Sequence, residues 1–554
     1  MSFATKADVD AVGNEMPWVE RSVSKTMYEF INSVAERHGK RPGISFQLTS
    51  GPKDKAETLS WQEFRDKSVQ AANLFRQLGI GEKDVVAYLL PICNEAALTL
   101  IGGSIAGIAN PINPLLEPEQ IAAILRETNA KVLVTLTGFP KTDLAQLAAD
   151  AVAEAPNVET VLEVDLNRYL SPPKSWIVPL IRPKVNVNHS ARVMNFNIEL
   201  DKHNLSLNFD DAADDRVAAY FHTGGTTGMP KVAQHKYSGM VYNGWLGDRL
   251  LFKPEDTIIC PLPLFHVFAC HVILMAMISS GAHVVFPTPQ GYRGDGVFDN
   301  FWKLIERWNV SFMITVPTAI SALMQRPIDA DVSSLRTAFS GSAPLPVELF
   351  KKFEKATGVE IVEGYGLTEA TCLVSCNPDQ GLKKVGSVGL PLPHTNVKIL
   401  MDTADGPKEC NRDEIGEICI ENPGVYAGNT YTELAKNDNL YHFETYLRTG
   451  DLGRIDEDGY LWITGRAKDL IIRGGHNIDP AEIEEALAGH EAVGFAGAIG
   501  QPDAHAGEIP CAYVELVGGG SATPEELIEF VNARVSEKAA QAKYIEILPE
   551  LPKT

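Results

Sequence analysis

The sequence predicts an α/β protein in which two doubly wound α/β subdomains and a small β-rich subdomain precede a small C-terminal α/β domain. Three observations support this prediction. Buried-strand-like runs alternate with amphipathic helices over residues 25–165 and again over 210–380, and such alternation is typical of parallel sheets covered by helices. Glycines and short alternating strands fill residues 385–464. Charged helices with short strands follow, so we expect a large domain over 1–465 and a small one over 466–554.

Length and composition favour an ordinary enzyme over a nucleic-acid binder. At 554 residues the chain is too long for one core, so roughly two to four domains are expected. The formal net charge is −22, whereas a general nucleic-acid binder needs a basic face. The eight cysteines contain no CxxC pair, which argues against a zinc site and for reduced thiols. Because the N-terminus lacks the apolar core of a signal peptide, we expect a cytoplasmic protein.

Each element of the first subdomain has a local signal. Apolar residues at helical spacing predict a helix over 24–38 that ends at Gly39. Ser60 and Glu63 form a capping box that opens a second helix, which ends at Gly79. The remaining expected elements are strands 84–90, 131–136 and 158–163 and helices 94–109, 117–128 and 141–154.

The alternation stops between about residues 164 and 210, where prolines, a tryptophan and basic residues gather. One interpretation is an ordered surface excursion between two α/β units. The alternative is a weak peripheral membrane contact, in which four apolar side chains enter a lipid surface beside three basic ones. The apolar residues are Trp176, Ile177, Leu180 and Ile181, and the basic residues are Lys174, Arg182 and Lys184.

A second alternation follows this segment. The most apolar stretch, residues 262–286, contains three histidines and predicts a buried helix and a strand rather than a membrane span. The expected strands are 217–222, 257–260, 283–286, 311–316 and 335–339, and the expected helices are 298–308, 317–325 and 346–356. Further helices are expected at 480–488 and 523–538.

A glycine-rich loop, YFHTGGTTGMPK at 220–231, directly follows the strand-like run 217–221. Glycines let consecutive backbone N–H groups point into one concavity, and threonine hydroxyls and a lysine add donors and charge. The loop differs from the common P-loop, because Met229 and Pro230 separate the last glycine from Lys231. A solvated turn is the simpler interpretation, but the position after a strand and the terminal cation favour phosphate binding.

Three further stretches carry chemistry. In EGYGLTEAT, residues 363–371, two glycines flank Tyr365, whose ring could stack on a base, and Thr368 and Glu369 offer a hydroxyl and a metal-seeking carboxylate. In residues 447–466, Asp451 lies between glycines and could accept both hydroxyls of a ribose. In residues 465–487, Pro480 and acidic residues begin a helix. Each stretch taken alone is also compatible with an ordinary turn.

In this order and spacing, the loop and the three stretches resemble those of the adenylate-forming superfamily of acyl- and aryl-CoA synthetases, adenylation domains and luciferases. The resemblance covers the chain from about residue 25. Within the superfamily, LPLFH at 262–266 and residues 114–134 look most like bacterial fatty acyl-CoA synthetases. The resemblance implies that a carboxylate is joined to the α-phosphate of ATP with release of pyrophosphate, and that the acyl group then passes to coenzyme A.

The resemblance also implies roles for single residues in the first step. The β- and γ-phosphates would be held by Thr223, Gly224, Gly225, Thr226, Thr227, Gly228 and Lys231. Glu369 would hold Mg²⁺, Thr368 the α-phosphate, and Asp451 with Arg466 the ribose side. The adenine would lie between Tyr365 and Gly341, Ser342 and Ala343, within a nucleotide site that also includes Glu363, Gly364 and Gly366.

For the second step, the resemblance implies that the C-terminal domain swings about a hinge at Lys468. The loop 473–476 would then shape the pantetheine tunnel, with Gly474 and Gly475 leaving room for coenzyme A. The acyl group needs an apolar slot with a polar mouth, for which the candidates are Tyr242, Trp245, His266 and Gly364. His266 matches the family's aromatic-His step, where it would gate or orient the carboxylate.

The chain departs from the family pattern at three places. Gly224 stands where the family often has serine, and His235 is only a near match to a family histidine, so we assign it no role. The family pattern continues past Leu-Pro-Lys-Thr at 551–554 into a Gly-Lys pair whose lysine serves adenylation, and Lys553 is not that lysine. We therefore expect the chain as given to adenylate slowly but still to transfer a supplied acyl-adenylate.

The sequence thus predicts an ATP- and Mg²⁺-dependent ligase that joins a medium- or long-chain fatty acid to coenzyme A and releases AMP. One rival is an adenylation enzyme that loads a carrier-protein phosphopantetheine. Another is a catalytically silent nucleotide- or lipid-binding protein. The chain length of the acid and the oligomeric state are left open.

Overall fold

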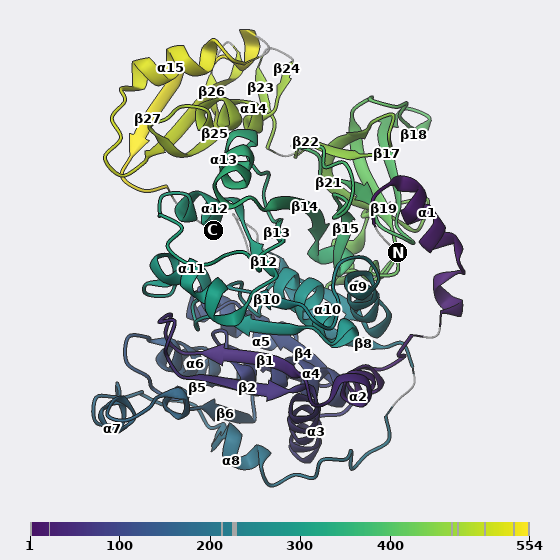
Figure 1. Ribbon diagram of the computed structural model, residues 1–554. Helices are drawn as coiled ribbons and strands as arrows, with labels where there is room; N and C mark the ends of the chain where they lie inside the picture. Colours follow the sequence, from purple (N-terminus) through teal and green to yellow (C-terminus); the bar gives the residue numbers. More distant parts are fainter. Residues whose placement is uncertain are drawn as a thin grey trace.

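A computed structural model describes residues 3–21, 23–211, 214–223, 230–466, 469–473, 476–503, 506–535 and 538–551. The N-terminal sheet lies at the bottom of Figure 1, the central sheet extends from the middle toward the bottom, and the β-rich subdomain and the C-terminal domain lie at the top. This layered α/β arrangement confirms the predicted fold class.

The N-terminal sheet has the strand order β7-β6-β5-β3-β4-β8-β9. Its strands run parallel except for the last pair, β8 and β9, which is an antiparallel hairpin. The strands are β3 (Val85–Tyr88), β4 (Ile108–Pro111), β5 (Ala130–Leu136), β6 (Thr160–Val164), β7 (Arg192–Asn195), β8 (Val217–Thr223) and β9 (Lys231–Lys236). The helices are α3 (Trp61–Gln77), α4 (Asn94–Ala106), α5 (Pro118–Glu127), α6 (Leu144–Ala153), α7 (Lys174–Ile177) and α8 (Phe196–Leu200).

The central sheet has the strand order β16-β15-β14-β13-β12-β10-β11-β1-β2. The strands are β1 (Pro42–Gln47), β2 (Ala56–Ser60), β10 (Thr257–Ile259), β11 (His283–Phe286), β12 (Phe312–Thr315), β13 (Thr337–Ser340), β14 (Glu360–Leu367), β15 (Cys372–Cys376) and β16 (Leu390–Pro391). The helices around it are α2 (Met27–His38), α9 (Tyr237–Leu250), α10 (Ala276–Ser280), α11 (Val297–Trp308), α12 (Pro317–Leu323) and α13 (Val347–Thr357). Strands β13 and β14 are parallel neighbours with Ser340 opposite Glu363, so their carboxyl ends meet at one edge.

The two sheets exchange strands across the boundary that the sequence predicted. The strand expected at 217–222 as the start of the second unit is β8, and it pairs with β4 of the N-terminal sheet. In the other direction, β1 pairs with β11 of the central sheet. The division into units at 25–165 and 210–380 is therefore wrong for these strands, because periodicity identifies a strand but not the neighbour it bonds.

Two smaller units complete the fold. The β-rich subdomain is an antiparallel sheet of β17 (Asn396–Thr403), β18 (Gly406–Glu409), β19 (Gly416–Glu421), β20 (Tyr441–His442), β21 (Tyr446–Ile455) and β22 (Leu461–Arg466). The C-terminal domain contains β23 (Ile471–Arg473), β24 (His476–Ile478), α14 (Pro480–Ala488), β25 (Val493–Asp503), β26 (Gly507–Leu516), α15 (Pro524–Asn532) and β27 (Tyr544–Leu548). Its buried side chains form a hydrophobic core of their own.

The apolar stretch 262–286 folds into the interior. Residues Phe268–Met275 form a π-helix that continues into α10, and β11 follows. Every residue of the π-helix is buried. Among the described residues, no helix is long and apolar enough to cross a membrane.

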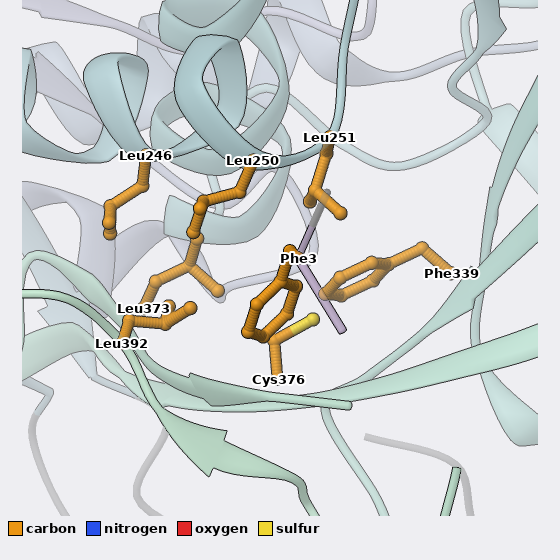
Figure 2. A pocket seen from close by; sticks show the side chains of 8 residues that line it. All are labelled: Phe3, Leu246, Leu250, Leu251, Phe339, Leu373, Cys376 and Leu392. Atoms are coloured by element: carbon orange, nitrogen blue, oxygen red, sulfur yellow. The ribbon is translucent and has the colours of Figure 1, made fainter. Parts of the chain in front are cut away.

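The first residues of the chain pack into the large domain. Phe3 is 1% exposed, and its carbonyl accepts a hydrogen bond of 3.1 Å from the backbone N–H of Gln380. Figure 2 shows its ring in a small apolar pocket. The pocket is lined by Phe3, Leu246, Leu250, Leu251, Phe339, Leu373, Cys376 and Leu392. The segment before helix α1 (Lys6–Asn14) thus closes one side of a cavity beneath strand β13.

The segment 164–210 is ordered through a buried carboxylate. Glu95 in α4 is fully buried, and it accepts hydrogen bonds from Arg168 at 2.6 Å, Tyr169 at 2.7 Å and Asn197 at 3.0 Å. All three donors come from the segment where the sequence pattern stops. A buried carboxylate requires such partners because its desolvation is costly.

The apolar residues of the suggested membrane contact are exposed in and after α7, on the periphery of the molecule (Figure 1). Trp176 is 69% exposed and Leu180 is 84% exposed. Lys174 and Lys184 are exposed beside them, whereas Arg182 bonds Asp165 at 2.6 Å. The contact stays a prediction.

Co-sedimentation with vesicles tests this contact. We expect the protein to pellet with anionic vesicles at low salt and to be released at high salt, because the lysines are screened. Trp176→Ser combined with Leu180→Ser should reduce pelleting, and Leu115→Ser, at an exposed leucine elsewhere, is the control. Failure of the unaltered protein to pellet would contradict the contact.

The Glu95 cluster predicts a stability effect. Arg168→Met should destabilise the N-terminal subdomain by about 3 kcal/mol, because it leaves a buried carboxylate without its cation. Adding Glu95→Gln should recover part of the loss. Lys202→Met, which removes an exposed pair with Glu199, should cost less than about 1 kcal/mol. Thermal unfolding of the four proteins measures the order, and equal losses for Arg168→Met and Lys202→Met would contradict it.

Candidate active site

The glycine-rich loop connects the strands of the β8–β9 hairpin. Thr223 lies opposite Lys231 in the pairing, so the two residues face each other where the loop leaves the sheet. The predicted phosphate-binding residues Gly224, Gly225, Thr226, Thr227 and Gly228 lie outside the described residues, and their role stays a prediction.

Lys231 lies close to a residue that the motifs did not identify. Its Nζ atom lies 4.8 Å from the centroid of the Tyr431 ring, and the Tyr431 hydroxyl donates a hydrogen bond of 2.5 Å to Glu369. Burial, and then the Glu369 carboxylate, raise the pKa of Tyr431, so the hydroxyl remains a donor. Tyr431 therefore connects the cation of the loop to the predicted metal ligand.

Tyr431 is held in place by backbone pairing. It forms an antiparallel bridge with Ala233 of β9. On either side of this bridge, the N–H of Gln234 donates to the carbonyl of Thr430 at 2.8 Å, and the N–H of Thr432 donates to that of Val232 at 3.0 Å. Residues 430–432 thus run along β9.

Thr368 and Glu369 begin a short 3₁₀ turn, Thr368–Ala370, directly after β14. The turn ends at Thr371, whose φ of 58° lies in the left-handed region. Glu369 offers the hard oxygen ligand that Mg²⁺ prefers, and Mg²⁺ sites commonly combine one or two carboxylates with substrate phosphates. The Tyr431 hydrogen bond orients this carboxylate without adding a positive charge, so the residues present fit the ion.

Tyr365, Asp451 and Arg466 form a connected group. The Tyr365 hydroxyl donates to one Asp451 oxygen at 2.5 Å, and Arg466 Nε donates to the other at 2.9 Å. Asp451 and Arg466 lie opposite each other on β21 and β22. Burial, followed by the Asp451 charge, raises the pKa of Tyr365 well above its usual value. A ribose would share the Asp451 oxygens with these donors, and each oxygen has lone pairs to do so.

Residues 341–343 and 363–366 meet because they follow or end the neighbouring strands β13 and β14. A Cβ atom on Gly364 would lie 2.4 Å from Phe339 Cζ, and one on Gly341 would lie 3.3 Å from the Phe268 ring. Ser342 has a φ of 71°. A Cβ atom at Gly364 would therefore displace the Phe339 ring, and one at Gly341 would contact the Phe268 ring tightly, a packing reason that sequence reasoning missed.

Glu363, on β14, is a buried carboxyl group with a raised pKa. It is 7% exposed, and among the described residues its Oε2 atom has no hydrogen-bond partner. Burial raises the pKa of Glu363 to about 7. The unpaired oxygen suits a ligand that brings a hydrogen-bond donor, such as an exocyclic amine.

His266 lies at the start of the apolar helix and is exposed. Its Nδ1 atom accepts a hydrogen bond of 3.3 Å from the backbone N–H of Phe268, so the neutral ring carries its proton on Nε2. That donor is available to an arriving carboxylate. The next turn of the helix brings the Phe268 ring to 5.6 Å from that of Phe339, which lines the pocket of Figure 2.

The other two acyl-site candidates contact a different region. Tyr242 is fully buried and donates to the Pro393 carbonyl at 2.6 Å. Trp245 packs against Trp18 and Arg21. Within the described part of the chain, neither shares a hydrogen bond or ring contact with His266, so their acyl-binding role stays a prediction. Phe268 and Phe339 are the better-placed apolar residues.

The residues predicted for the second step lie mostly outside the described chain. Lys468, Gly474 and Gly475 fall there, and their hinge and coenzyme A roles stay predictions. Nearby, Arg473 donates to the carbonyl of Ala539 at 2.6 Å. It is therefore bonded within the C-terminal domain.

Comparison with known proteins identifies the family of the chain. Residues 31–429 match the description "AMP-binding enzyme", and residues 482–554 match "AMP-binding enzyme C-terminal domain". The chain is 36% identical to a marinolic acid–CoA ligase of Pseudoalteromonas sp. (strain SANK 73390), over 97% of this chain and 80% of that protein. It is 30% identical to a long-chain-fatty-acid–CoA ligase of Bacillus subtilis (strain 168), over 98% of this chain and 94% of that protein.

Solved structures share the fold. The anthranilate–CoA ligase AuaEII in complex with anthranoyl-AMP matches with a TM-score of 0.81 and 23% identity, over 97% of this chain and 96% of that one. The o-succinylbenzoate–CoA synthetase of Bacillus subtilis, in complex with ATP and a magnesium ion, matches with a TM-score of 0.73 and 22% identity, over 95% of this chain and 96% of that one. With motifs, fold and both family descriptions in agreement, the chain belongs to the AMP-binding enzymes of the adenylate-forming superfamily.

Proposed function

We propose that the protein is an ATP- and Mg²⁺-dependent acid–CoA ligase whose acid is a medium- or long-chain fatty acid. The observation that carries the proposal is the linked set of Lys231, Tyr431 and Glu369 beside the Tyr365–Asp451 pair. It combines a cation from β9, a metal-seeking carboxylate that follows β14 and a nucleoside-binding carboxylate from β21. The chain's 36% identity to a marinolic acid–CoA ligase and 30% identity to a long-chain-fatty-acid–CoA ligase support coenzyme A as the acceptor.

In the first step, a carboxylate oxygen of the acid bonds to the α-phosphorus of ATP, and the bond to the bridging β-phosphate oxygen breaks. Pyrophosphate leaves, and an acyl-adenylate remains. Lys231 offsets charge on the leaving phosphates, and the Thr368 hydroxyl donates to the α-phosphate. Glu369 would hold Mg²⁺, which when bound neutralises part of the phosphate charge. His266 Nε2–H orients the carboxylate before attack.

In the second step, the sulfur of coenzyme A bonds to the acyl carbon, and AMP leaves with the electrons of the broken acyl–phosphate bond. The thiol proton passes to solvent. The C-terminal domain would turn about Lys468 to bring the loop 473–476 to the nucleotide. Apolar residues Phe268 and Phe339 favour an aliphatic or aromatic chain over a charged one.

A panel of acids tests the proposal. With ATP, Mg²⁺ and coenzyme A, we expect AMP and an acyl-CoA to form fastest with aliphatic acids of medium or long chain. Aryl acids and short acids serve as comparisons, and a carrier-protein phosphopantetheine replaces coenzyme A in a parallel reaction. Fastest turnover of an aryl acid would overturn the fatty-acid part. Turnover with the carrier protein alone would support the rival loading enzyme. Absence of acid-dependent pyrophosphate exchange by a chain extended past Thr554 would support the silent binding protein.

Lys231→Ala separates the two half-reactions. We expect adenylation, measured by acid-dependent pyrophosphate exchange, to fall by about 10²–10³-fold, because a charge on the leaving group is no longer offset. Thioester formation from preformed acyl-AMP should change little. Lys236→Ala is the matched control, since Lys236 lies on the same strand but pairs with Asp215. Equal loss in both half-reactions would show that Lys231 does not act on the pyrophosphate.

A further inference from the structure

Two buried histidines lie behind the candidate site and have no assigned role. His235 on β9 is 1% exposed, and His271 on the π-helix is fully buried. Their rings pack against Phe221 of β8, with centroid distances of 5.0 Å and 4.7 Å. Such histidines are often plain core residues, so a role must come from their hydrogen bonds.

The hydrogen bonds form a directed chain. His235 Nε2 lies 2.7 Å from the carbonyl oxygen of Thr368, and His235 Nδ1 lies 2.9 Å from His271 Nε2. A carbonyl only accepts, so Nε2 of His235 must carry a proton. Burial lowers the pKa of His235 to about 4. The ring is therefore neutral near pH 7, and its Nδ1 is an acceptor.

The same argument assigns the tautomer of the His271 ring. Because His235 Nδ1 accepts, His271 Nε2 must be the donor, and the neutral His271 ring then has a bare Nδ1. Among the described residues that Nδ1 atom is buried without a hydrogen-bond partner, as this assignment requires of an atom that carries no proton. Both histidines are thus Nε2–H tautomers that donate toward Thr368.

The series of hydrogen bonds ends at the peptide group that joins Thr368 to Glu369. Its carbonyl also accepts the N–H of Thr371 at 3.1 Å, which closes the 3₁₀ turn. Alternating side chains of a strand share a face, so Lys231 and His235 project from the same face of β9. Lys231 reaches Tyr431 and His235 reaches Thr368. Tyr431 therefore holds the Glu369 carboxylate, and His235 holds the peptide group that precedes Glu369.

We propose that His235 is a positioning residue that fixes the Thr368–Glu369 peptide for nucleotide and metal binding, and that His271 sets the tautomer in which His235 can do so. The proposal rests on the proposed function for the roles of Thr368 and Glu369. Neither histidine touches substrate. They act by orienting the Thr368 hydroxyl and the Glu369 carboxylate, whose residues are joined by this peptide group.

Two substitutions of His235 test the proposal. The side-chain amide of His235→Gln places an N–H close to where Nε2 stands, so it can still donate to Thr368. His235→Leu fills similar space without a donor. We expect His235→Leu to lose about 10²-fold in acid-dependent pyrophosphate exchange, since small misplacement of a reacting group costs that much. His235→Gln should recover most of the loss, and neither variant should slow thioester formation from preformed acyl-AMP by more than about threefold.

Binding provides a readout besides activity. Calorimetry of ATP should show that His235→Leu weakens binding by about tenfold when Mg²⁺ is present and by much less when a chelator removes it. His235→Gln should bind like the unaltered protein. Equal losses for both variants, in both half-reactions and with lowered thermal stability, would mean that His235 is only a core residue and would overturn the proposal.

The tautomers can be read without any variant. In ¹⁵N spectra of histidine-labelled protein, His235 and His271 should both appear as neutral Nε2–H rings near pH 7. An Nδ1–H tautomer of His235 would overturn the proposal even if His235→Leu fails to fold. If a chain extended past Thr554 shows no pyrophosphate exchange with any acid, the proposed function fails, whereas the tautomers and the Mg²⁺ dependence of ATP binding still test the positioning role.

Discussion

The pairing of residues 430–432 with strand β9 joins the β-rich subdomain to the N-terminal sheet. The bridge between Ala233 and Tyr431 and the two flanking backbone hydrogen bonds fix this contact. Through it, the Tyr431 ring comes to rest beside Lys231, and its hydroxyl meets Glu369 from the central sheet. Residues 430–432 therefore connect the three units that contribute to the site, which are the N-terminal sheet, the central sheet and the β-rich subdomain. Backbone pairing suits this task because it does not depend on the side chains that bind ligand.

Tyrosine hydroxyls, rather than cations alone, orient the carboxylates of the site. Tyr431 donates to Glu369, and Tyr365 donates to Asp451. Burial raises the pKa of both tyrosines, so they stay neutral donors. A neutral donor fixes a carboxylate without cancelling its charge, which leaves Glu369 able to attract a metal ion. An acidic protein of net charge −22 can hold a polyanion in this way, since local donors and a bound cation decide the interaction.

Local signals in the sequence predict many of the helices and strands, but they do not predict how the strands pair into sheets. The capping box of Ser60 and Glu63 is present at the start of α3, and the helix predicted at 298–308 is α11. The strand at 217–222, β8, was assigned to the wrong unit and β1 was not predicted, because each pairs with a sheet formed mainly by distant residues. The buried helix predicted within 262–286 is present, but nothing in the local sequence predicts its π-helical geometry over Phe268–Met275.

As with the fold, the sequence predicted the motif residues of the site but not the residues that pack against them. The motif residues Tyr365 and Asp451 do come together, because β14 carries the first and β21 the second, and Thr368 and Glu369 follow directly after β14. Tyr431 and Phe339 were missed, and His235 was given no role. Each of the three contacts a motif residue. A tyrosine in a loop or a histidine in a strand becomes informative only when its partner is known.

The glycines of the nucleotide motifs illustrate how the predicted base site adjoins an apolar pocket. From the sequence, Gly364 seemed to free the face of Tyr365 for a base. In the structure its missing Cβ makes room for Phe339, whose ring lies 5.6 Å from Phe268 and lines the apolar pocket closed by Phe3. The strand that carries the adenine motif therefore packs directly on the residues that bound the apolar space. A change in the size of residue 339 would alter both the pocket and the path of β14. Phe268, Phe339 and Phe3 all lie outside the motifs that identify the superfamily, although Phe339 packs against a glycine of one of them.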